Sequence, residues 1–285
     1  MTVILRAEGL SKRFGGLKAV DSVDLQLNDG EILGVIGPNG AGKTTLFSMI
    51  AGSIPPTSGR VVLEGKVISG GSPRRAVRAG VVRTHQIVRP FQNLTVLENV
   101  MVGAIYGKAR PLGARERALE LLDFCSLRER APQLPGGLTL AGRKRLELAR
   151  ALATEPRVLL LDEVIAGVNP AEALQMTDLI RSVREKRRLS IILIEHVMPA
   201  VMRLSDRVIV LDAGKKIAEG KPPQVVKDPR VIAAYLGESA SEAALGPGSL
   251  PTPVSGSGPA SHPTPSSNPT PISSSPSKKG PGGRP

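Results

Sequence analysis

A glycine-rich segment at residues 37–44 has the spacing G-x-x-x-x-G-K-[ST], which binds phosphates. It follows an apolar run, "ILGVI", and precedes a helix-forming run, which is the context that the pattern requires. Glycines let backbone N–H groups converge on a polyphosphate, and the helix N-terminus adds its positive dipole. We expect Lys43 to reach the β- and γ-phosphates and Thr44 to ligate Mg²⁺. The residues predicted to bind the phosphates are Gly37, Pro38, Asn39, Gly40, Ala41, Gly42, Lys43, Thr44 and Thr45.

An acidic pair, Asp162 and Glu163, ends a second apolar run, "RVLLLDE". Ligands bind at the carboxyl ends of strands in open α/β sheets. Asp162 suits Mg²⁺, and Glu163 is placed to polarise a water molecule that attacks the γ-phosphate. Such a pair can also form a turn or a helix cap, but a phosphate loop in the same chain favours the catalytic interpretation.

Two further polar residues, Gln86 and His196, follow similar strand ends in "VVRTHQIV" and "IILIEHVM". Either residue alone would be an ordinary surface side chain. Their order along the chain, after the phosphate loop and after the acidic pair respectively, makes both candidates for the same site.

The elements that must position these residues alternate between strand-like and helix-like runs, which predicts an α/β sheet covered by helices. The runs "ILGVI" and "VLLL" are apolar throughout, as in parallel strands buried on both faces. Between about residues 91 and 152 the pattern is helical, which predicts an inserted helical subdomain. The helices are expected at Lys43–Ala51, Arg115–Leu127, Arg143–Ala153 and Ala171–Lys186.

Composition sets the limits of the folded part. The chain has 285 residues, 41% of them hydrophobic, and its one cysteine, Cys125, excludes an internal disulfide and suggests a small buried hydrophobe. No apolar run is long enough to span a bilayer. From residue 239 the sequence is mostly Pro, Ser and Gly, so we expect a folded unit over 1–238 and a disordered tail over 239–285.

The formal charge of +13 fits an arginine-rich solvated surface. Because only 2% of the residues are aromatic, we expect little stacking on single-stranded nucleic acid.

The candidate residues follow a fixed order along the chain: the phosphate loop, Gln86, a helical stretch, the acidic pair and His196. This order resembles that of the ATP-binding subunit of ABC transporters. Finer strings, "RFGGLKAV", "NLTVLENVMVG", "AGVNP" and "VIAAYLGE", resemble the ATPase subunits of importers for branched-chain and other hydrophobic amino acids. The resemblance covers residues 2–238. It implies a P-loop (RecA-like) nucleotide-binding core of the α/β class, with ATP and Mg²⁺ as ligands.

The resemblance also implies roles for individual residues. Phe14 would stack on adenine, Gln86 would touch Mg²⁺ and the attacking water, and His196 would contact the γ-phosphate. Residues 167–169 would form a loop that crosses between two subunits, and the segment near 89–100 would receive a helix of a membrane permease. The implied partners are a second ATP-binding subunit, identical or related, the permease and, indirectly, a substrate-binding protein. The implied location is the cytoplasmic face of the cell membrane. No nucleic-acid partner is expected.

The stretch Leu138-Thr139-Leu140-Ala141-Gly142 stands where the family has a signature close to L-S-G-G-Q. Thr139 keeps a hydroxyl that could contact the nucleotide of the partner subunit, but Ala141 replaces a glycine and Gly142 a glutamine. We interpret the stretch as a divergent signature. Arg143, Lys144 and Arg145 follow it, where they could add attraction for a triphosphate.

Two alternatives remain beside amino-acid import. A soluble ABC-type ATPase acting on ribosomes or DNA would suit the basic charge, but the chain has one phosphate loop and no heptad run. A subunit that binds nucleotide with impaired hydrolysis would suit the divergent signature. The retained Lys43, Asp162, Glu163 and His196 argue against impaired hydrolysis.

Overall fold

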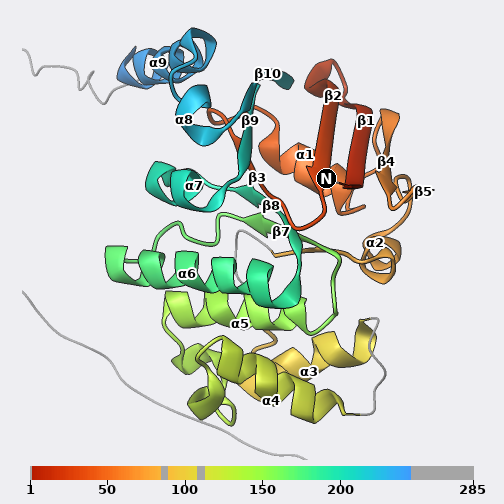
Figure 1. The fold of residues 1–285 in the computed structure, drawn as a ribbon, viewed down its shortest axis with the longest axis vertical. Helices are drawn as coiled ribbons and strands as arrows, with labels where there is room; N and C mark the ends of the chain where they lie inside the picture. The colour runs from red at the N-terminus through yellow and green to blue at the C-terminus, as the bar shows by residue number, and fades with distance from the viewer. Residues whose placement is uncertain (1, 85–88, 108–112, 245–285) are drawn as a thin grey trace, which may run out of the picture. The chain divides into compact units, whose positions relative to one another are not determined.

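A six-stranded sheet contains the apolar runs that were expected to be strands (Figure 1). The computed structural model describes residues 2–84, 89–107 and 113–244. The strand order is β10 (Lys215–Gly220), β9 (Arg207–Asp212), β3 (Ile32–Ile36), β8 (Ser190–Ile194), β7 (Val158–Asp162) and β6 (Val81–Arg83). The strands from β9 to β6 are parallel, and β10 pairs antiparallel with β9. β3, β7 and β8 are buried along their whole length because both faces of this sheet are covered.

A second, antiparallel sheet lies beside the first and was not anticipated as a separate layer. Its order is β2 (Leu17–Asn28), β1 (Val3–Phe14), β4 (Ser58–Leu63) and β5 (Lys66–Val67). Residues of β2 alternate between buried and exposed, as in a strand with one solvated face. The buried side chains of this sheet join Leu46 and Phe47 of α1 (Lys43–Ile50) in one apolar cluster. The phosphate-loop helix is therefore held between the two sheets.

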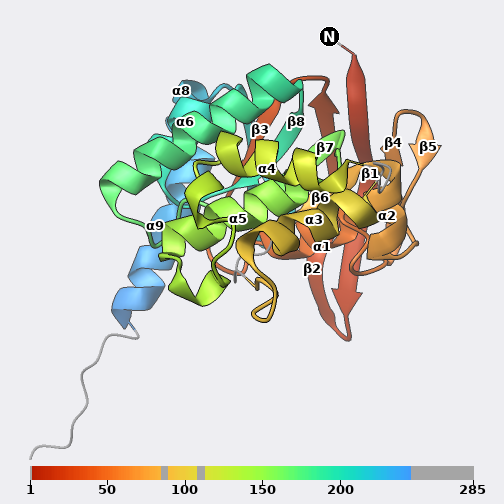
Figure 2. The same cartoon turned by 90° about the horizontal axis from the view of Figure 1, so that it is seen from below.

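The other face of the six-stranded sheet is covered by helices. Its apolar side chains pack with α5 (Leu140–Leu152), α6 (Pro170–Arg187) and α7 (Met198–Leu204). Figure 2 shows α4 (Ala114–Phe124) and α5 in front of the six-stranded sheet. Shorter helices, α2 (Pro73–Ala79) and α8 (Pro222–Val225), follow strands β5 and β10.

The stretch between Phe91 and Leu152 is helical in its described residues. It contains α3 (Val96–Tyr106), α4 (Ala114–Phe124), the 3₁₀ turns Arg128–Arg130 and Pro135–Gly137, and α5. Cys125 is buried in the apolar cluster of this region, as expected of a small hydrophobe, and burial raises the pKa of its thiol to about 12. α5 begins at Leu140 rather than at Arg143, so the signature stretch forms the first turn of a helix and not a loop before it.

The last described helix, α9 (Pro229–Ala244), continues six residues beyond the boundary at 238 that composition suggested. The six added residues, "SASEAA", are Ala, Glu and Ser, and alanine and glutamate favour helix. The rest of the expected tail, 245–285, lies outside the described residues. None of the helices within the described ranges has the length and apolarity needed to cross a bilayer.

Candidate functional site

The phosphate loop joins β3 to α1 and has a backbone that only glycine permits at two points. Gly37 has φ 148° and Gly42 has φ 98°. A Cβ on Gly37 would lie 2.0 Å from the Leu211 carbonyl oxygen, and one on Gly42 would lie 2.3 Å from that of Ala19. The loop is thus pressed against neighbouring backbone with its N–H groups able to converge on an anion.

Lys43 opens α1 and is folded back over the loop. Its Nζ donates hydrogen bonds to the carbonyl oxygens of Gly37 (2.7 Å) and Pro38 (2.8 Å). The residue is buried although it carries a charge. A buried ammonium group surrounded by a glycine-rich loop is suited to bind phosphate oxygens.

A cavity of about 550 Å³ brings together most of the residues that the sequence singled out. Phe14 stands at its edge, half exposed, and Glu163 and His196 close it from the strand ends. The remaining predicted residues in its lining are Asn39, Gly40, Ala41, Gly42, Lys43, Thr44 and Thr45. Gly37, Pro38 and Asp162 are not in this lining, and Gln86 is outside the described residues. The cavity has an apolar edge and a polar floor, as a nucleotide requires.

The end of β7 supplies two carboxylates with different surroundings. The side chain of Asp162 is 0% exposed, and its Oδ2 accepts a hydrogen bond from the Arg83 guanidinium at 2.5 Å. Its Oδ1 has no hydrogen-bond partner among the described residues. A buried, unsatisfied carboxylate oxygen beside a phosphate loop fits a hard cation such as Mg²⁺.

Glu163 turns back toward the cavity because its backbone is left-handed, with φ 51°. This conformation is unfavourable for a residue with a Cβ and is typical of functional sites. Glu163 Oε1 lies 3.0 Å from Nε2 of His196, which follows β8. The sequence predicted both residues for the site but not their direct pairing. The histidine can therefore orient the carboxylate that is expected to polarise water.

Two buried ionisable residues, Glu195 and Lys144, contact the segment that follows this pair; sequence reasoning missed Glu195 and gave Lys144 a different role. Glu195 Oε1 accepts a hydrogen bond from the Ile165 N–H at 2.7 Å. Burial raises the pKa of Glu195 to about 7, against the opposing effects of the Ile165 N–H and the Lys144 cation. Lys144 donates to the carbonyl oxygens of Glu163 (2.9 Å) and Ala166. Burial lowers the pKa of Lys144, and the nearby carboxylates oppose that shift.

For Lys144, which is buried, these contacts correct the expectation that the cations after the signature could add attraction for a triphosphate. Lys144 instead holds the backbone that follows the acidic pair. Arg143 donates to the Leu138 carbonyl oxygen (3.1 Å), and Arg145 donates to Gln175 Oε1 (2.6 Å). Successive side chains of a helix point in different directions, so three neighbouring cations on α5 have different partners.

Thr139 is the N-cap of α5, and its Oγ1 accepts a hydrogen bond from the Gly142 N–H at 3.1 Å. It lines a separate cavity of about 220 Å³, together with Arg145 and Glu172. Thr139 and the phosphate loop therefore do not share a cavity within one chain. A helix N-terminus of this kind attracts anions from outside the chain.

The segment after Glu163 leads into α6 through a second cap. Gly167 has φ 76°, and the Asn169 side chain accepts a hydrogen bond from Glu172 N–H in a capping box. The loop predicted at 167–169 therefore forms the capped N-terminal start of α6, at the surface of the chain.

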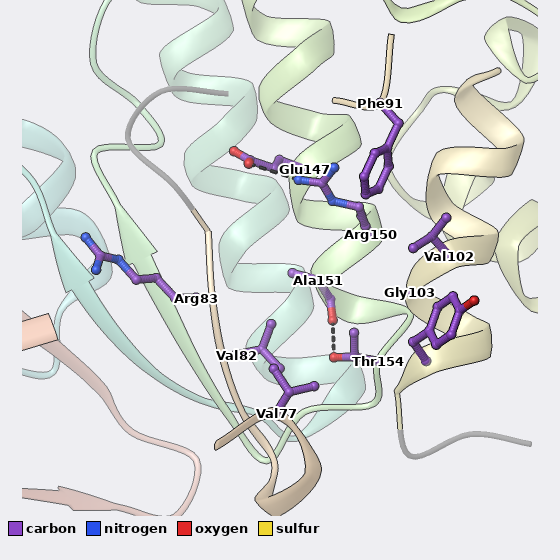
Figure 3. A pocket seen from close by; sticks show the side chains of 11 residues that line it. Val77, Val82, Arg83, Phe91, Val102, Gly103, Glu147, Arg150, Ala151 and Thr154 are labelled. Carbon is purple, nitrogen blue, oxygen red and sulfur yellow. Dashed lines mark hydrogen bonds and ion pairs between the residues drawn. The ribbon is translucent and has the colours of Figure 1, made fainter. Parts of the chain in front are cut away.

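A shallow groove of about 260 Å³ lies beside the site, between α3, α5 and β6 (Figure 3). Phe91 is in its lining, and the Arg150 guanidinium lies 5.3 Å from the centre of that ring. Asn99 fixes the adjoining loop by donating to the carbonyl oxygens of Phe91, Leu94 and Thr95. The groove thus includes part of the segment near 89–100 that was expected to receive a permease helix.

Residues 20–166 match the family described as ABC transporter, and residues 215–241 match the one described as branched-chain amino acid ATP-binding cassette transporter. The high-affinity branched-chain amino acid transport ATP-binding protein LivG of Escherichia coli (strain K12) is 40% identical, covering 83% of this chain and 98% of LivG. BraF of Pseudomonas aeruginosa, described in the same words, is 39% identical over the same shares. The crystal structure of the ADP conformation of MJ1267, an ATP-binding cassette of an ABC transporter, superposes with a TM-score of 0.76 at 34% identity, covering 84% of this chain and 100% of that one.

Proposed function

Because this chain belongs to the ABC transporter family of ATP-binding proteins, we propose that it hydrolyses ATP to drive uptake of branched-chain or other hydrophobic amino acids. The transport substrate is proposed from the names of LivG and BraF and from the match at residues 215–241. The observation that carries the catalytic part is the pairing of Glu163 with His196 across the mouth of the phosphate-loop cavity.

In the proposed site, the loop and Lys43 bind the phosphates and Phe14 packs on the base. Thr44 and Asp162 would hold Mg²⁺, with Gln86 as a further ligand, and this ion would neutralise charge on the phosphates. Glu163 accepts the proton of the attacking water, and His196 keeps its carboxylate turned toward the γ-phosphate. Gln86 enters by the resemblance alone, since it lies outside the described residues.

The site needs a second ATP-binding subunit, because Thr139 and the helix N-terminus that it caps lie apart from the phosphate loop of the same chain. We infer a head-to-tail pair in which the capped end of α5 meets the γ-phosphate held by the partner, which is either a second copy or a related ATPase. The entry to α6 at 167–169 would lie at the same contact.

The permease is proposed to dock on the groove at Phe91 and Arg150. The Phe91 ring and the Arg150 guanidinium form a partly apolar surface there, and Tyr106 in the same lining is 77% exposed. Large exposed aromatic side chains at a groove are typical of interaction sites. Through this contact the subunit would sit on the cytoplasmic face of the membrane, and a separate binding protein would present the amino acid.

Glu163→Gln tests the catalytic assignment. The change removes the proton acceptor while leaving the loop, so ATP affinity should stay within about twofold and turnover in the assembled transporter should fall at least about 100-fold. Lys43→Ala is the matched control, since it should weaken ATP binding itself. Near-normal hydrolysis by Glu163→Gln would remove Glu163 from the catalytic role, and unchanged ATP binding by Lys43→Ala would argue against the phosphate site.

A further inference from the structure

Arg83 lies on β6, next to the strand that carries the acidic pair. It is paired in register with Leu160 of β7, and Asp162 is two residues farther along that strand. Residues two apart in a strand face the same side of the sheet. Arg83 therefore reaches along that face to Asp162, with 2.5 Å between its Nη2 and Oδ2. The two side chains are 11% and 0% exposed, so the contact is a buried ion pair.

The second arm of the same guanidinium reaches the phosphate-loop helix. Its Nη1 donates to Ser48 Oγ at 2.8 Å, and Ser48 Oγ donates in turn to the Thr44 carbonyl oxygen at 2.7 Å. The guanidinium carbon also lies 5.9 Å from the centre of the Phe47 ring. One side chain thus connects α1, which carries the predicted Mg²⁺ ligand Thr44, with β7, which carries the other, Asp162.

One oxygen of Asp162 is buried without a hydrogen-bond partner among the described residues, which fits a cation as its missing partner. Arg83 contacts Oδ2, whereas Oδ1 has no hydrogen-bond partner among the described residues. Arg83 is in the lining of the groove, but Figure 3 shows its side chain directed away from Phe91 and Arg150. A planar guanidinium can hold two oxygen acceptors at fixed angles, which an ammonium group cannot do.

We propose that Arg83 is a positioning residue for the Mg²⁺–nucleotide site. It fixes the Asp162 carboxylate with one oxygen bound and the other presented, and it holds that carboxylate at a set distance from α1. Without Arg83 the buried carboxylate would lack its cationic partner and would turn or draw in water. The inference rests on the proposed ATP site, but it concerns the metal dependence of binding and not binding itself.

The test measures binding of a non-hydrolysable ATP analogue, AMP-PNP, to the full chain by calorimetry, in EDTA and over a series of Mg²⁺ concentrations. Three variants are compared. Arg83→Met removes the charge, and Arg83→Lys keeps a charge on a single nitrogen. Ser48→Ala removes the hydroxyl on α1 that accepts from Arg83. Arg157→Met is the matched control, because Arg157 forms an exposed ion pair with Glu64. Thermal melting of each variant reports whether it is folded.

For Arg83→Met we expect affinity in EDTA within about twofold of the unmodified chain and a Mg²⁺ requirement raised by about 10-fold or more, the usual effect of losing a partner of a metal ligand. Arg83→Lys should recover only part of this loss, because one ammonium group cannot hold both acceptors, and should leave the requirement raised by about threefold or more. Ser48→Ala should raise the requirement by about threefold, and Arg157→Met should change nothing.

The proposal is overturned if Arg83→Met is folded and its Mg²⁺ requirement is unchanged. It is also overturned if affinity with and without Mg²⁺ falls in parallel, because that shows a merely structural role. If Arg83→Met does not fold, unchanged Mg²⁺ requirements in both Arg83→Lys and Ser48→Ala have the same consequence. Failure of the unmodified chain to bind AMP-PNP at all would instead contradict the proposed function.

Discussion

Buried charges around the acidic pair distinguish this site from an ordinary phosphate loop. Glu195, Lys144 and Arg83 each contact the segment that carries Asp162 or Glu163. Burying a charge is unfavourable unless partners compensate it, so such residues are retained where they fix a geometry. The site is therefore a set of polar contacts that orient the carboxylates of Asp162 and Glu163.

Glu195 makes the stability of the fold depend on pH. Its pKa is raised to about 7 by burial, above the 4.5 of an unperturbed glutamate, so the folded state holds the proton more tightly. The stabilisation is complete below pH 4.5 and is lost as the pH rises through 7, by about 3 kcal/mol in all. The unfolding free energy of the unmodified chain should therefore fall over this window relative to that of Glu195→Gln.

Urea unfolding of both proteins between pH 5 and 8 measures this difference. The variant keeps an oxygen that can accept from the Ile165 N–H. A difference in unfolding free energy that does not change with pH would mean that Glu195 is ionised throughout in the folded chain.

Helix α5 serves both the fold and the proposed dimer. Thr139 caps it, Lys144 ties its second turn to the backbone after Glu163, and Arg150 reaches the groove. A single rigid helix thus connects the signature stretch, the catalytic strand and the proposed permease surface.

Thr139→Arg tests the role of the helix start. A large cation at the cap should block approach to the partner's nucleotide, so ATP turnover in the assembled transporter should be lost. ATP binding to the isolated subunit should stay within about twofold, because the phosphate loop lies in another cavity. Thr139→Ser keeps the capping hydroxyl and is the control. Normal hydrolysis by Thr139→Arg in the complete transporter would show that the stretch is only the beginning of a helix.

At the scale of the whole molecule, the described helices and strands belong to one unit that extends to Leu245. Its C-terminal helix, α9, is not an appendage: Val231 is buried in an apolar cluster with Ile36 and Val210, and Tyr235 packs against that cluster. The described packing of the fold therefore reaches at least Tyr235 in α9.

Removing residues 246–285 should leave the melting temperature within about 2 °C and the ATPase activity unchanged. The segment is mostly Pro, Ser and Gly, with too little apolar surface to stabilise a fold. A deletion that begins at Pro229 is the control, because it also removes Val231 and should lower the melting temperature by several degrees. A comparable loss for the shorter deletion would show that the tail contributes to the fold.

The sequence alone determined the parts whose physics is local. The spacing of Gly37, Gly42 and Lys43 dictates a phosphate loop because backbone conformation and a helix start lie within a few residues. The all-apolar runs of β3 and β7 indicate strands buried on both faces for the same reason. These two features were sufficient to place Asp162 and Glu163 at a strand end beside the loop.

Only the tertiary structure decided which charges meet. Arg83 and Asp162 are 79 residues apart in sequence, and Lys144 lies 19 and 22 residues from the carbonyl groups that it contacts. The antiparallel pairing of β1 and β2 was also missed. The alternation of apolar and polar residues in a strand with one solvated face is a weaker sequence signal than an unbroken apolar run. Strand order and register bring these residues together, and no local pattern encodes them, since each contact depends on how distant segments bury their apolar faces.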